Sequence, residues 1–384
     1  MAEQRVIANV NDLQDGQMKQ VDLDEDRSIL LVRVDGEFHA LGSTCPHHGA
    51  PLADGILEGH RVVCPWHQSV FDAISGGYIE PPTFDGIPVY ETRVEGENVV
   101  VDLPDKLASS TRPELATHDA GADQRTTVIV GSGAAGFLAA QSMREGDYRG
   151  RIVMITQEQV APYDRTELSK RYLAKPDAPE PFLRPEKFYT RFGIDLQPGR
   201  EVTEVDPEAK TVACADGTEY SYDRLLLATG SRPRQLPVEG AELENVRLLR
   251  TFADCEFLRA QAGQINRAVV VGASFIGMEV AGSLASRGVH VTVIAPESVP
   301  FELVMGRPVG RMYQQVHEEN GNEFRMGRKV QRFEGDGKVE AVVLDDGERL
   351  EAEMVVIGIG VEPVTDYLKG IVANEKGAVS VDTR

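Results

Sequence analysis

The sequence carries one unusual pattern twice, in Cys45-Pro46-His47-His48-Gly49 and in Cys64-Pro65-Trp66-His67. Each stretch offers one thiol and one imidazole, spaced as C-x-H in the first and as C-x-x-H in the second. Two thiolates and two imidazoles together form a complete ligand set for a metal centre. Cys45, His47, Cys64 and His67 are therefore the candidate ligands, whereas His48 fits no ligand position and is interpreted as a loop residue.

Two kinds of metal centre use such a set. Zinc binds two cysteines and two histidines, but zinc-finger spacing places both cysteines in one half of the motif and both histidines in the other. A Rieske [2Fe–2S] centre has two thiolates on one iron and two imidazoles on the other, and its two loops each supply one of both types. The mixed halves favour a Rieske centre over zinc, and over an accidental grouping of core residues.

The surrounding residues predict a small all-β domain over residues 1–104. Apolar runs recur at short spacing, for example at 29–34 and 98–101, and Asp35-Gly36 and Glu95-Gly96 are typical of hairpin turns. Residues 105–124 are rich in alanine, serine, threonine and aspartate. We interpret that stretch as a flexible linker.

Beyond the linker, a strand–turn–helix pattern occurs twice. Strand 127–130 leads into Gly131-Ser132-Gly133-Ala134-Ala135-Gly136, and strand 268–271 leads into Gly272-Ala273-Ser274-Phe275-Ile276-Gly277. Glycines at this spacing let the turn close and let backbone N–H groups approach a pyrophosphate at the helix N-terminus. The repeat predicts two Rossmann-like α/β domains, at 125–240 and 241–361, with 362–384 returning to the first and leaving it incomplete.

In the first of these domains we expect Gly131, Gly133, Ala135 and Gly136 to contact a dinucleotide. A carboxylate at the end of the next strand, 151–156, should meet the adenosine ribose. Gln157 stands at that end and Glu158 follows it, so Glu158 is the candidate. The alternative is that Glu158 is an ordinary solvated loop acid.

Three further segments carry a family resemblance. Pro162-Tyr163-Asp164-Arg165-Thr166-Glu167-Leu168-Ser169-Lys170 resembles the P-Y-x-R-x-x-L-S-K segment of FAD-dependent ferredoxin reductases and apoptosis-inducing-factor relatives. Ala228-Thr229-Gly230 matches their A-T-G strand end, and the second glycine turn with Glu279 matches G-x-x-[FY]-I-G-x-E. Residues 355–363, with Gly360, resemble the strand that closes the second domain.

The resemblance implies a cofactor for each domain. FAD would bind the first, with Arg165 facing it and Lys170 beside the flavin N5. NAD(P)H would bind the second, with contacts at Gly272, Ser274, Ile276, Gly277 and Gly360. Glu279 would pair with Lys170 as the catalytic pair. Ala295 occupies the place of the acid that binds the ribose 2′-OH, and Glu297 follows two residues later. No arginine comes next to bind a 2′-phosphate, which favours NADH over NADPH.

The first 105 residues resemble Rieske-type ferredoxins and the Rieske modules of ring-hydroxylating systems. That resemblance implies a serine and a tyrosine hydroxyl as hydrogen-bond donors to the cluster. Ser69 matches the serine, but Phe71 stands where the tyrosine would be. Because donors to the sulfurs raise the potential of a cluster, we predict a low-potential, ferredoxin-like centre.

The whole chain thus resembles Rieske-fused, apoptosis-inducing-factor-like FAD-dependent pyridine nucleotide oxidoreductases. The implied function is an enzyme in which NAD(P)H reduces FAD, and the flavin passes electrons to the cluster and on to an unknown acceptor, with an oxygenase or an electron-carrier protein as the candidates. Two alternatives remain open: a reductase component of an oxygenase system, and a non-catalytic redox sensor. The resemblance also implies a second flavin motif and a C-terminal interface domain after Arg384, so we interpret the chain as a fragment or a departure from the family.

Composition narrows the partners. The net charge of −21 opposes binding to nucleic acid or anionic lipid, and no run approaches the roughly 18 apolar residues of a spanning helix. Four cysteines in 384 residues build no disulfide scaffold and fit the reducing cytoplasm. Cys214 and Cys255 are isolated, which argues against disulfide reduction.

Overall fold

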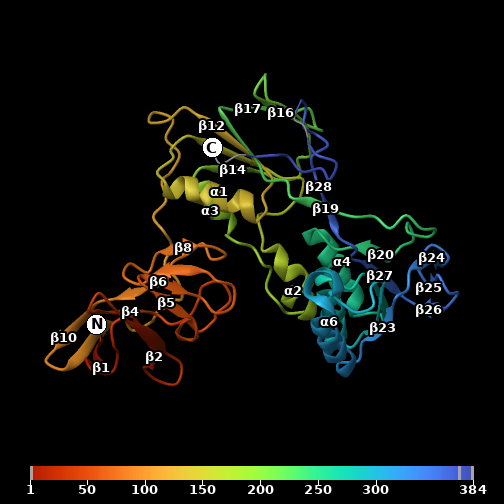
Figure 1. The fold of residues 1–384 in the computed structure, drawn as a ribbon. Helices are drawn as coiled ribbons and strands as arrows, with labels where there is room; N and C mark the ends of the chain where they lie inside the picture. The colour runs from red at the N-terminus through yellow and green to blue at the C-terminus, as the bar shows by residue number, and fades with distance from the viewer. Residues whose placement is uncertain (1–2, 371–372, 382–384) are drawn as a thin grey trace. The chain divides into compact units, whose positions relative to one another are not determined.

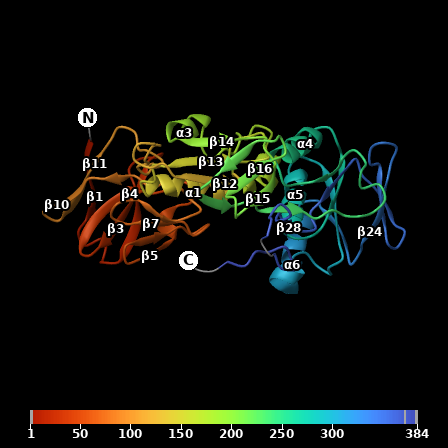
Figure 2. The same cartoon turned by 90° about the horizontal axis from the view of Figure 1, so that it is seen from above.

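The computed structural model describes residues 3–370 and 373–381 and divides into two compact units, Met1–Leu115 and Ala116–Arg384. Figures 1 and 2 show strands throughout the first unit and alternating strands and helices in the second. This agrees with the predicted all-β domain followed by Rossmann-like α/β structure. The finer predicted boundaries stay predictions, and residues 371–372 and 382–384 of the predicted return segment lie outside the described residues.

Antiparallel strands build the first unit. The sheets have the orders β1-β11-β10, β2-β3-β4-β9 and β5-β6-β7-β8. Their elements are β1 (Glu3–Asn9), β2 (Gln17–Asp22), β3 (Ser28–Val34), β4 (Glu37–Gly42), the 3-10 helix η1 (Leu52–Asp54), β5 (Ile56–Glu58), β6 (Arg61–Val63), β7 (Val70–Asp72), β8 (Tyr78–Glu80), β9 (Val89–Tyr90), β10 (Thr92–Glu95) and β11 (Asn98–Leu103).

The hairpin of β3 and β4 explains how this sequence folds locally. Asp35 and Gly36 both have positive φ, at 54° and 80°, which is the geometry of the tight turns that match strand twist. The apolar run of β3 is buried from Ile29 to Val32. Its side chains help to form cores on both faces of the sheet, and one of these cores includes Cys45 and Cys64.

The second unit begins with a four-stranded parallel sheet of order β14-β13-β12-β18, beside a three-stranded antiparallel sheet of β15, β16 and β17. Parallel strands with apolar runs and a crossover helix are the expected product of the first strand–turn–helix pattern. The elements are β12 (Thr126–Val130), α1 (Ala134–Glu145), β13 (Arg151–Ile155), η2 (Arg165–Ser169), α2 (Arg171–Ala174), α3 (Glu186–Arg191), β14 (Ile194–Gln197), β15 (Val202–Asp206), β16 (Thr211–Cys214), β17 (Glu219–Ser221), β18 (Arg224–Leu227) and β19 (Ser231–Pro233).

A second parallel sheet follows, with five strands in the order β20-β27-β21-β22-β23, and β24, β25 and β26 form an antiparallel sheet. Strand β28 pairs with β19 and so returns the chain to the first half of the unit. The elements are β20 (Val246–Leu248), α4 (Phe252–Ala262), β21 (Arg267–Val271), α5 (Phe275–Ala285), β22 (His290–Ala295), α6 (Glu302–Glu319), β23 (Glu323–Met326), β24 (Val330–Glu334), β25 (Ala341–Leu344), β26 (Arg349–Glu351), β27 (Met354–Ile357) and β28 (Val361–Pro363).

Residues 105–124 form no regular helix or strand, but two positions near the middle of the stretch are held by backbone hydrogen bonds. Thr111 exchanges two backbone hydrogen bonds with Gly86 of the first unit. Ala116 donates to the Arg144 carbonyl of the second unit. These bonds leave a shorter free stretch than the predicted flexible linker of twenty positions, because the backbone of its middle part is already satisfied by each unit.

A buried arginine fixes the end of α1. Arg144 is 0% exposed, and its guanidinium donates to four backbone carbonyls. Burial lowers the pKa of Arg144, but the carbonyls supply acceptors on every side. Arg144 therefore ties the helix end to the turns around it. The accepting carbonyls are those of Tyr148, Gly150, Phe192 and Gly193.

Candidate functional site

The two cysteine–histidine loops have the same backbone hydrogen bonds. In each loop the cysteine N–H donates to the carbonyl five residues later, and the cysteine carbonyl accepts from the N–H four residues later. The loops are therefore two copies of one local structure, with a cysteine at the start of each. The bonds join Cys45 to Ala50 and Gly49, and Cys64 to Ser69 and Gln68, at 2.8 to 3.2 Å.

The matching position in both loops needs a left-handed backbone. Gly49 has φ 77° and Gln68 has φ 63°. Glycine takes this conformation without steric cost, whereas a glutamine does so only under strain. The left-handed residue turns each loop back on itself, which lets the histidine lie near the histidine of the other loop.

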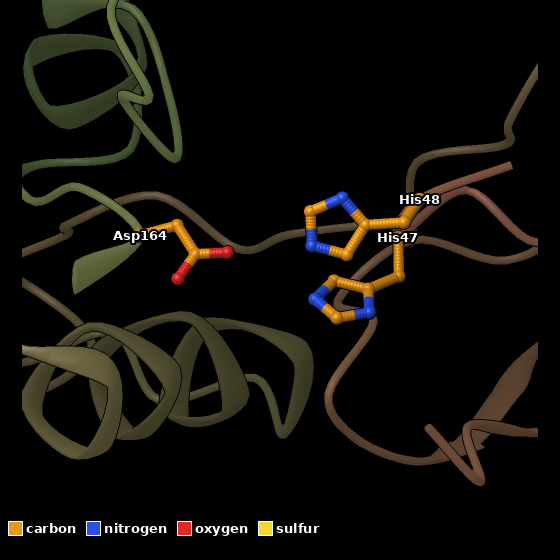
Figure 3. A group of neighbouring side chains, drawn as sticks. All are labelled: His47, His48 and Asp164. Atoms are coloured by element: carbon orange, nitrogen blue, oxygen red, sulfur yellow. The ribbon is translucent and has the colours of Figure 1, made fainter. Parts of the chain in front are cut away.

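The structure brings the four predicted ligands together in the first unit. Cys45 and Cys64 are each 2% exposed and share one hydrophobic core. The rings of His47 and His67 lie 4.9 Å apart between centroids. His48, predicted as a loop residue, has its ring centroid 4.0 Å from that of His47. Figure 3 shows the two rings beside each other.

The chemistry of these donors fits a diiron cluster. Burial, with a smaller contribution from the neighbouring Cys64, raises the pKa of the Cys45 thiol to about 11. Iron would supply the positive charge that holds buried thiols as thiolates. Two sulfurs inside the core and two imidazoles at its edge match the division of ligands between the two irons of a Rieske centre.

Ser69 lies where a hydrogen bond to the sulfurs was predicted. Its side chain is 0% exposed, its Oγ accepts from the Thr83 N–H at 3.1 Å, and its hydroxyl is hydrogen-bonded to Cys45. Because Oγ accepts from Thr83, its own hydrogen is left to point to sulfur. Phe71 is fully buried in the core that contains both cysteines, and it brings no hydroxyl there.

A cavity of about 480 Å³ opens at the first glycine turn. This volume lies in the usual range for small-molecule sites. Gly131, Gly133, Ala135, Glu158, Arg165, Ala228, Thr229 and Gly230, all predicted contacts, line it. The predicted contacts Gly136 and Lys170 are not among the lining residues.

The three glycines of this turn do three different things. A Cβ on Gly131 would lie 2.2 Å from the Ala228 carbonyl oxygen, and one on Gly136 would lie 1.9 Å from the Gly131 oxygen. A Cβ on Gly133 would meet nothing within 4 Å, so it would stand in the open cavity. These positions are the tight turn, the close helix–strand packing and the close approach that a pyrophosphate needs. The cradle fits FAD.

Glu158 lines the cavity, but its carboxylate already has protein donors. It accepts from the Tyr163 hydroxyl at 2.7 Å, from Arg165 at 2.8 Å and from the Phe252 N–H at 3.1 Å. A carboxylate has room for about four donors, so a ribose hydroxyl is still possible. The predicted ribose contact stays a prediction, and the solvated loop acid is the poorer description of this buried network.

Sequence reasoning missed several of the cavity residues, and two of them carry polar groups with a clear setting. Arg250 follows β20, and Tyr367 follows β28; both line the cavity, and neither lies in a recognisable motif. Burial lowers the pKa of Arg250 and the nearby Arg165 lowers it further, so two guanidiniums lie together where an anionic group would offset their repulsion. The Tyr367 hydroxyl is hydrogen-bonded to Thr229 at 3.0 Å.

The second glycine turn repeats the geometry of the first. A Cβ on Gly272 would lie 2.3 Å from the Gly358 oxygen, and one on Gly277 would lie 2.0 Å from the Gly272 oxygen. Ser274 replaces the middle glycine at the N-terminus of α5, where its side chain makes no capping hydrogen bond. Ile276 is in the first turn of the same helix, and Gly360, with φ 101°, follows β27. The turn fits a second dinucleotide.

Lys170 and Glu279 meet as predicted. The Lys170 Nζ donates to the Glu279 Oε2 at 3.0 Å, across 109 positions of sequence. The Ser169 hydroxyl donates to the same oxygen at 2.5 Å. The pair joins the L-S-K segment of the first dinucleotide half to helix α5 of the second.

The comparisons with known proteins agree with this geometry. A family model described as pyridine nucleotide-disulphide oxidoreductase matches residues 125–384, and one described as Rieske [2Fe-2S] domain matches residues 3–91. The chain belongs to the pyridine nucleotide-disulphide oxidoreductase family and carries a Rieske domain. The Rieske match indicates a [2Fe–2S] cluster, and the reductase family indicates FAD and NAD(P)H.

Its relatives include an apoptosis-inducing factor and a putidaredoxin reductase, which match the two groups named in the family resemblance. Apoptosis-inducing factor 3 of Mus musculus is 37% identical over 386 residues, which cover 98% of this chain and 63% of the relative. Putidaredoxin reductase of Pseudomonas putida is 38% identical over 65% of this chain and 62% of its own length. A solved covalent putidaredoxin reductase–putidaredoxin complex aligns with a TM-score of 0.60 and 38% identity, over 62% of this chain and 59% of that one.

The chain thus spans a little under two thirds of the length of these relatives. All four cysteines lie within the described residues and are free and buried. Cys214 ends β16 and Cys255 lies on α4, so the four cysteines place no pair at the first glycine turn. Among the described helices, none combines the length and apolar character that crossing a bilayer requires.

Proposed function

We propose that this chain is the electron-transfer part of an FAD-dependent NAD(P)H oxidoreductase that delivers electrons through a Rieske [2Fe–2S] cluster to an acceptor outside the chain. Two-electron acceptance from NAD(P)H is the chemistry that FAD supplies when bound, and one-electron transfer is that of the cluster. Cys45, His47, Cys64 and His67 would hold the cluster. The cavity residues at the first glycine turn would hold FAD, and the second turn would hold the coenzyme.

The contact between Lys170 and Glu279 carries this proposal. A lysine and a glutamate at 3.0 Å, one on each dinucleotide half, place a fixed charge pair where the two halves meet. Side chains held in this way can orient a nicotinamide against a flavin and stabilise charge as it moves between them. The role of the chain is therefore positioning and electrostatics.

Anaerobic stopped-flow reduction of the FAD-loaded, cluster-loaded protein tests the proposal. We expect NADH to bleach the flavin absorbance, and the EPR signal of a reduced Rieske cluster to follow on the timescale of turnover. Flavin reduction without a cluster signal would contradict internal relay, and no reduction by NADH or NADPH would contradict the whole function. NADH is the expected donor, since Ala295 and the residues after it offer no arginine for a 2′-phosphate.

A matched pair of variants tests the contact between Lys170 and Glu279. Glu279→Gln keeps the shape of the side chain but removes the charge that Lys170 faces. Glu353→Gln is its control, because Glu353 accepts from the Asn266 and Arg267 N–H groups at the other end of β21. We expect only Glu279→Gln to slow flavin reduction, by about tenfold, which corresponds to the loss of one charge-assisted hydrogen bond.

A narrower function has its own support. Trp66 is 56% exposed between Cys64 and His67, so an aromatic ring lies in solvent beside the candidate cluster. Such a ring suits contact with a carrier protein, and one relative is the ferredoxin–NAD(+) reductase subunit of a benzene 1,2-dioxygenase system of Pseudomonas putida, 34% identical over 66% of this chain. Service to an oxygenase would require the reduced protein to reduce a Rieske oxygenase, and Trp66→Ala should weaken that step alone. Four reduced cysteines favour the cytoplasm as its location.

A further inference from the structure

The segment that carries Lys170 is held by hydrogen bonds to the helix of the second dinucleotide half. Helix α5 starts at the second glycine turn, and Glu279 and Ser283 lie four residues apart on it, which places them on one face. Glu279 accepts from both Ser169 and Lys170. Ser283 contacts the backbone of those same two residues from one turn further along.

The Ser283 contact is buried and short. The side chain is 7% exposed, and its hydroxyl donates to the Ser169 carbonyl at 2.7 Å, with the Lys170 carbonyl at 3.3 Å. From the neighbouring helix α4, the Cys255 thiol donates to the Leu168 carbonyl at 3.1 Å. Side chains of α4 and α5 therefore hold three consecutive carbonyls of the L-S-K segment. The bond from Ser283 to the Ser169 carbonyl is buried, so solvent does not compete for that carbonyl.

We propose that Ser283 is a positioning residue that fixes Lys170 relative to the coenzyme helix. The inference rests on the proposed function, because it concerns the Lys170–Glu279 pair of that site. The Glu279 contact alone constrains the end of a long, flexible side chain. Ser283 constrains the backbone at the base of that side chain. Both ends of Lys170 are therefore held by α5, the helix whose N-terminus forms the second glycine turn.

The consequence is a defined location for the ammonium group. Lys170 Nζ bonds Glu279 at 3.0 Å and the Thr166 carbonyl at 3.1 Å, while its side chain stays 47% exposed. A half-exposed lysine normally samples several rotamers. With the base of the side chain held by Ser283 and the tip held by Glu279, the charge stays beside the boundary of the two halves instead of moving into solvent.

Ser283→Ala and Ser286→Ala form a matched test. Both remove one serine hydroxyl from the same helix end, and each hydroxyl donates to a backbone carbonyl at 2.7 Å. The Ser286 bond goes to the Ser283 carbonyl and leaves the L-S-K segment untouched. The FAD-loaded full chain is mixed with NADH in a stopped-flow instrument, and the limiting rate of flavin reduction and the half-saturating NADH concentration are compared with the melting temperature.

We expect Ser283→Ala to slow the limiting rate about fivefold, the effect of one neutral hydrogen bond, with a half-saturating concentration like that of Ser286→Ala. Its melting temperature should be lower than that of Ser286→Ala, because the buried Ser169 carbonyl loses its donor. Equal limiting rates in the two variants would overturn the inference. A loss of rate that disappears when both variants are assayed well below their melting temperatures, or a change confined to NADH affinity, would overturn it as well.

A second readout separates this inference from the proposed function. The flavin midpoint potential, measured by chemical reduction without coenzyme, responds to a cation near the flavin. Ser283→Ala should shift that potential in the direction of Lys170→Met, and Ser286→Ala should not. If neither NADH nor NADPH reduces the wild type, the proposed function fails, whereas the potentials still decide whether Ser283 positions Lys170.

Discussion

Replacement of Ser69 by alanine removes a hydroxyl that is hydrogen-bonded to a candidate cluster cysteine. The Ser69 Oγ accepts from the buried Thr83 N–H at 3.1 Å and is hydrogen-bonded to Cys45. The variant deletes both bonds and leaves a small gap at a position that is 0% exposed. Two effects follow, one on the cluster potential and one on the stability of the first unit.

The effect on the potential has a defined sign and an upper limit. A hydrogen bond to a charged acceptor is worth about 1.5–3 kcal/mol, and it favours the reduced cluster because that state carries more negative charge. For a one-electron couple, about 1.4 kcal/mol corresponds to about 59 mV. Loss of the bond should therefore lower the midpoint potential by at most roughly 60–130 mV, the difference between the two redox states being smaller than the whole bond.

The effect on stability comes from Thr83. Its N–H lies in the interior and loses its acceptor, which costs about 1–3 kcal/mol. Dye-mediated titration followed by EPR gives the potential, and thermal melting of the cluster-loaded protein gives the stability. Ser28→Ala is the control. Ser28 lies on β3, and its hydroxyl is hydrogen-bonded to that of Ser43 at 2.8 Å and to neither cysteine. An unchanged potential in Ser69→Ala, beside a lowered melting temperature, would refute the hydrogen bond to sulfur.

Three further changes test other parts of the structure. Phe71→Tyr should raise the midpoint potential in the same titration, because it adds a hydroxyl to the core that holds both cysteines; an unchanged or lower value would contradict the low-potential prediction. Gln68→Gly should raise the stability of the first unit by about 1 kcal/mol in thermal melts, since φ 63° strains glutamine and not glycine. Arg144→Met should lower the free energy of unfolding of the second unit by about 3 kcal/mol or more in denaturant titrations, because it leaves buried carbonyls without donors; a change below 1 kcal/mol would show that water replaces the guanidinium.

The sequence was most informative where the chemistry is local. The two cysteine–histidine stretches and the two glycine turns each lie within a few residues, so spacing alone constrains their geometry. The Gly131 and Gly136 positions have the close backbone approaches that the motif predicts. Lys170 and Glu279 lie 109 positions apart, and their pairing was predicted only through the family resemblance.

Long-range packing accounts for what the sequence did not reveal. Arg250 and Tyr367 enter the cavity because β20 and β28 end beside it, and no nearby pattern marks either residue. Ser283 looks like a small residue on an apolar helix until η2 is placed against α5. The stretch 105–124 has the composition of a flexible linker, but Gly86 and Arg144 hold its middle part by backbone bonds that composition does not encode.

Buried polar side chains connect these observations. Within the described residues of the first unit, the buried polar side chains are Ser43, Ser69 and Thr83, and Ser69 and Thr83 together direct a hydrogen bond to Cys45. Burial of a polar group costs free energy unless it is bonded, so a core built only for stability would place apolar groups at these positions. In the second unit, Ser169 and Ser283 are also buried and bonded, and both act on the segment that bears Lys170. Ser69 and Ser283 are thus buried hydroxyl groups that act on candidate redox sites, so alanine at either position should change a potential or a rate as well as the stability.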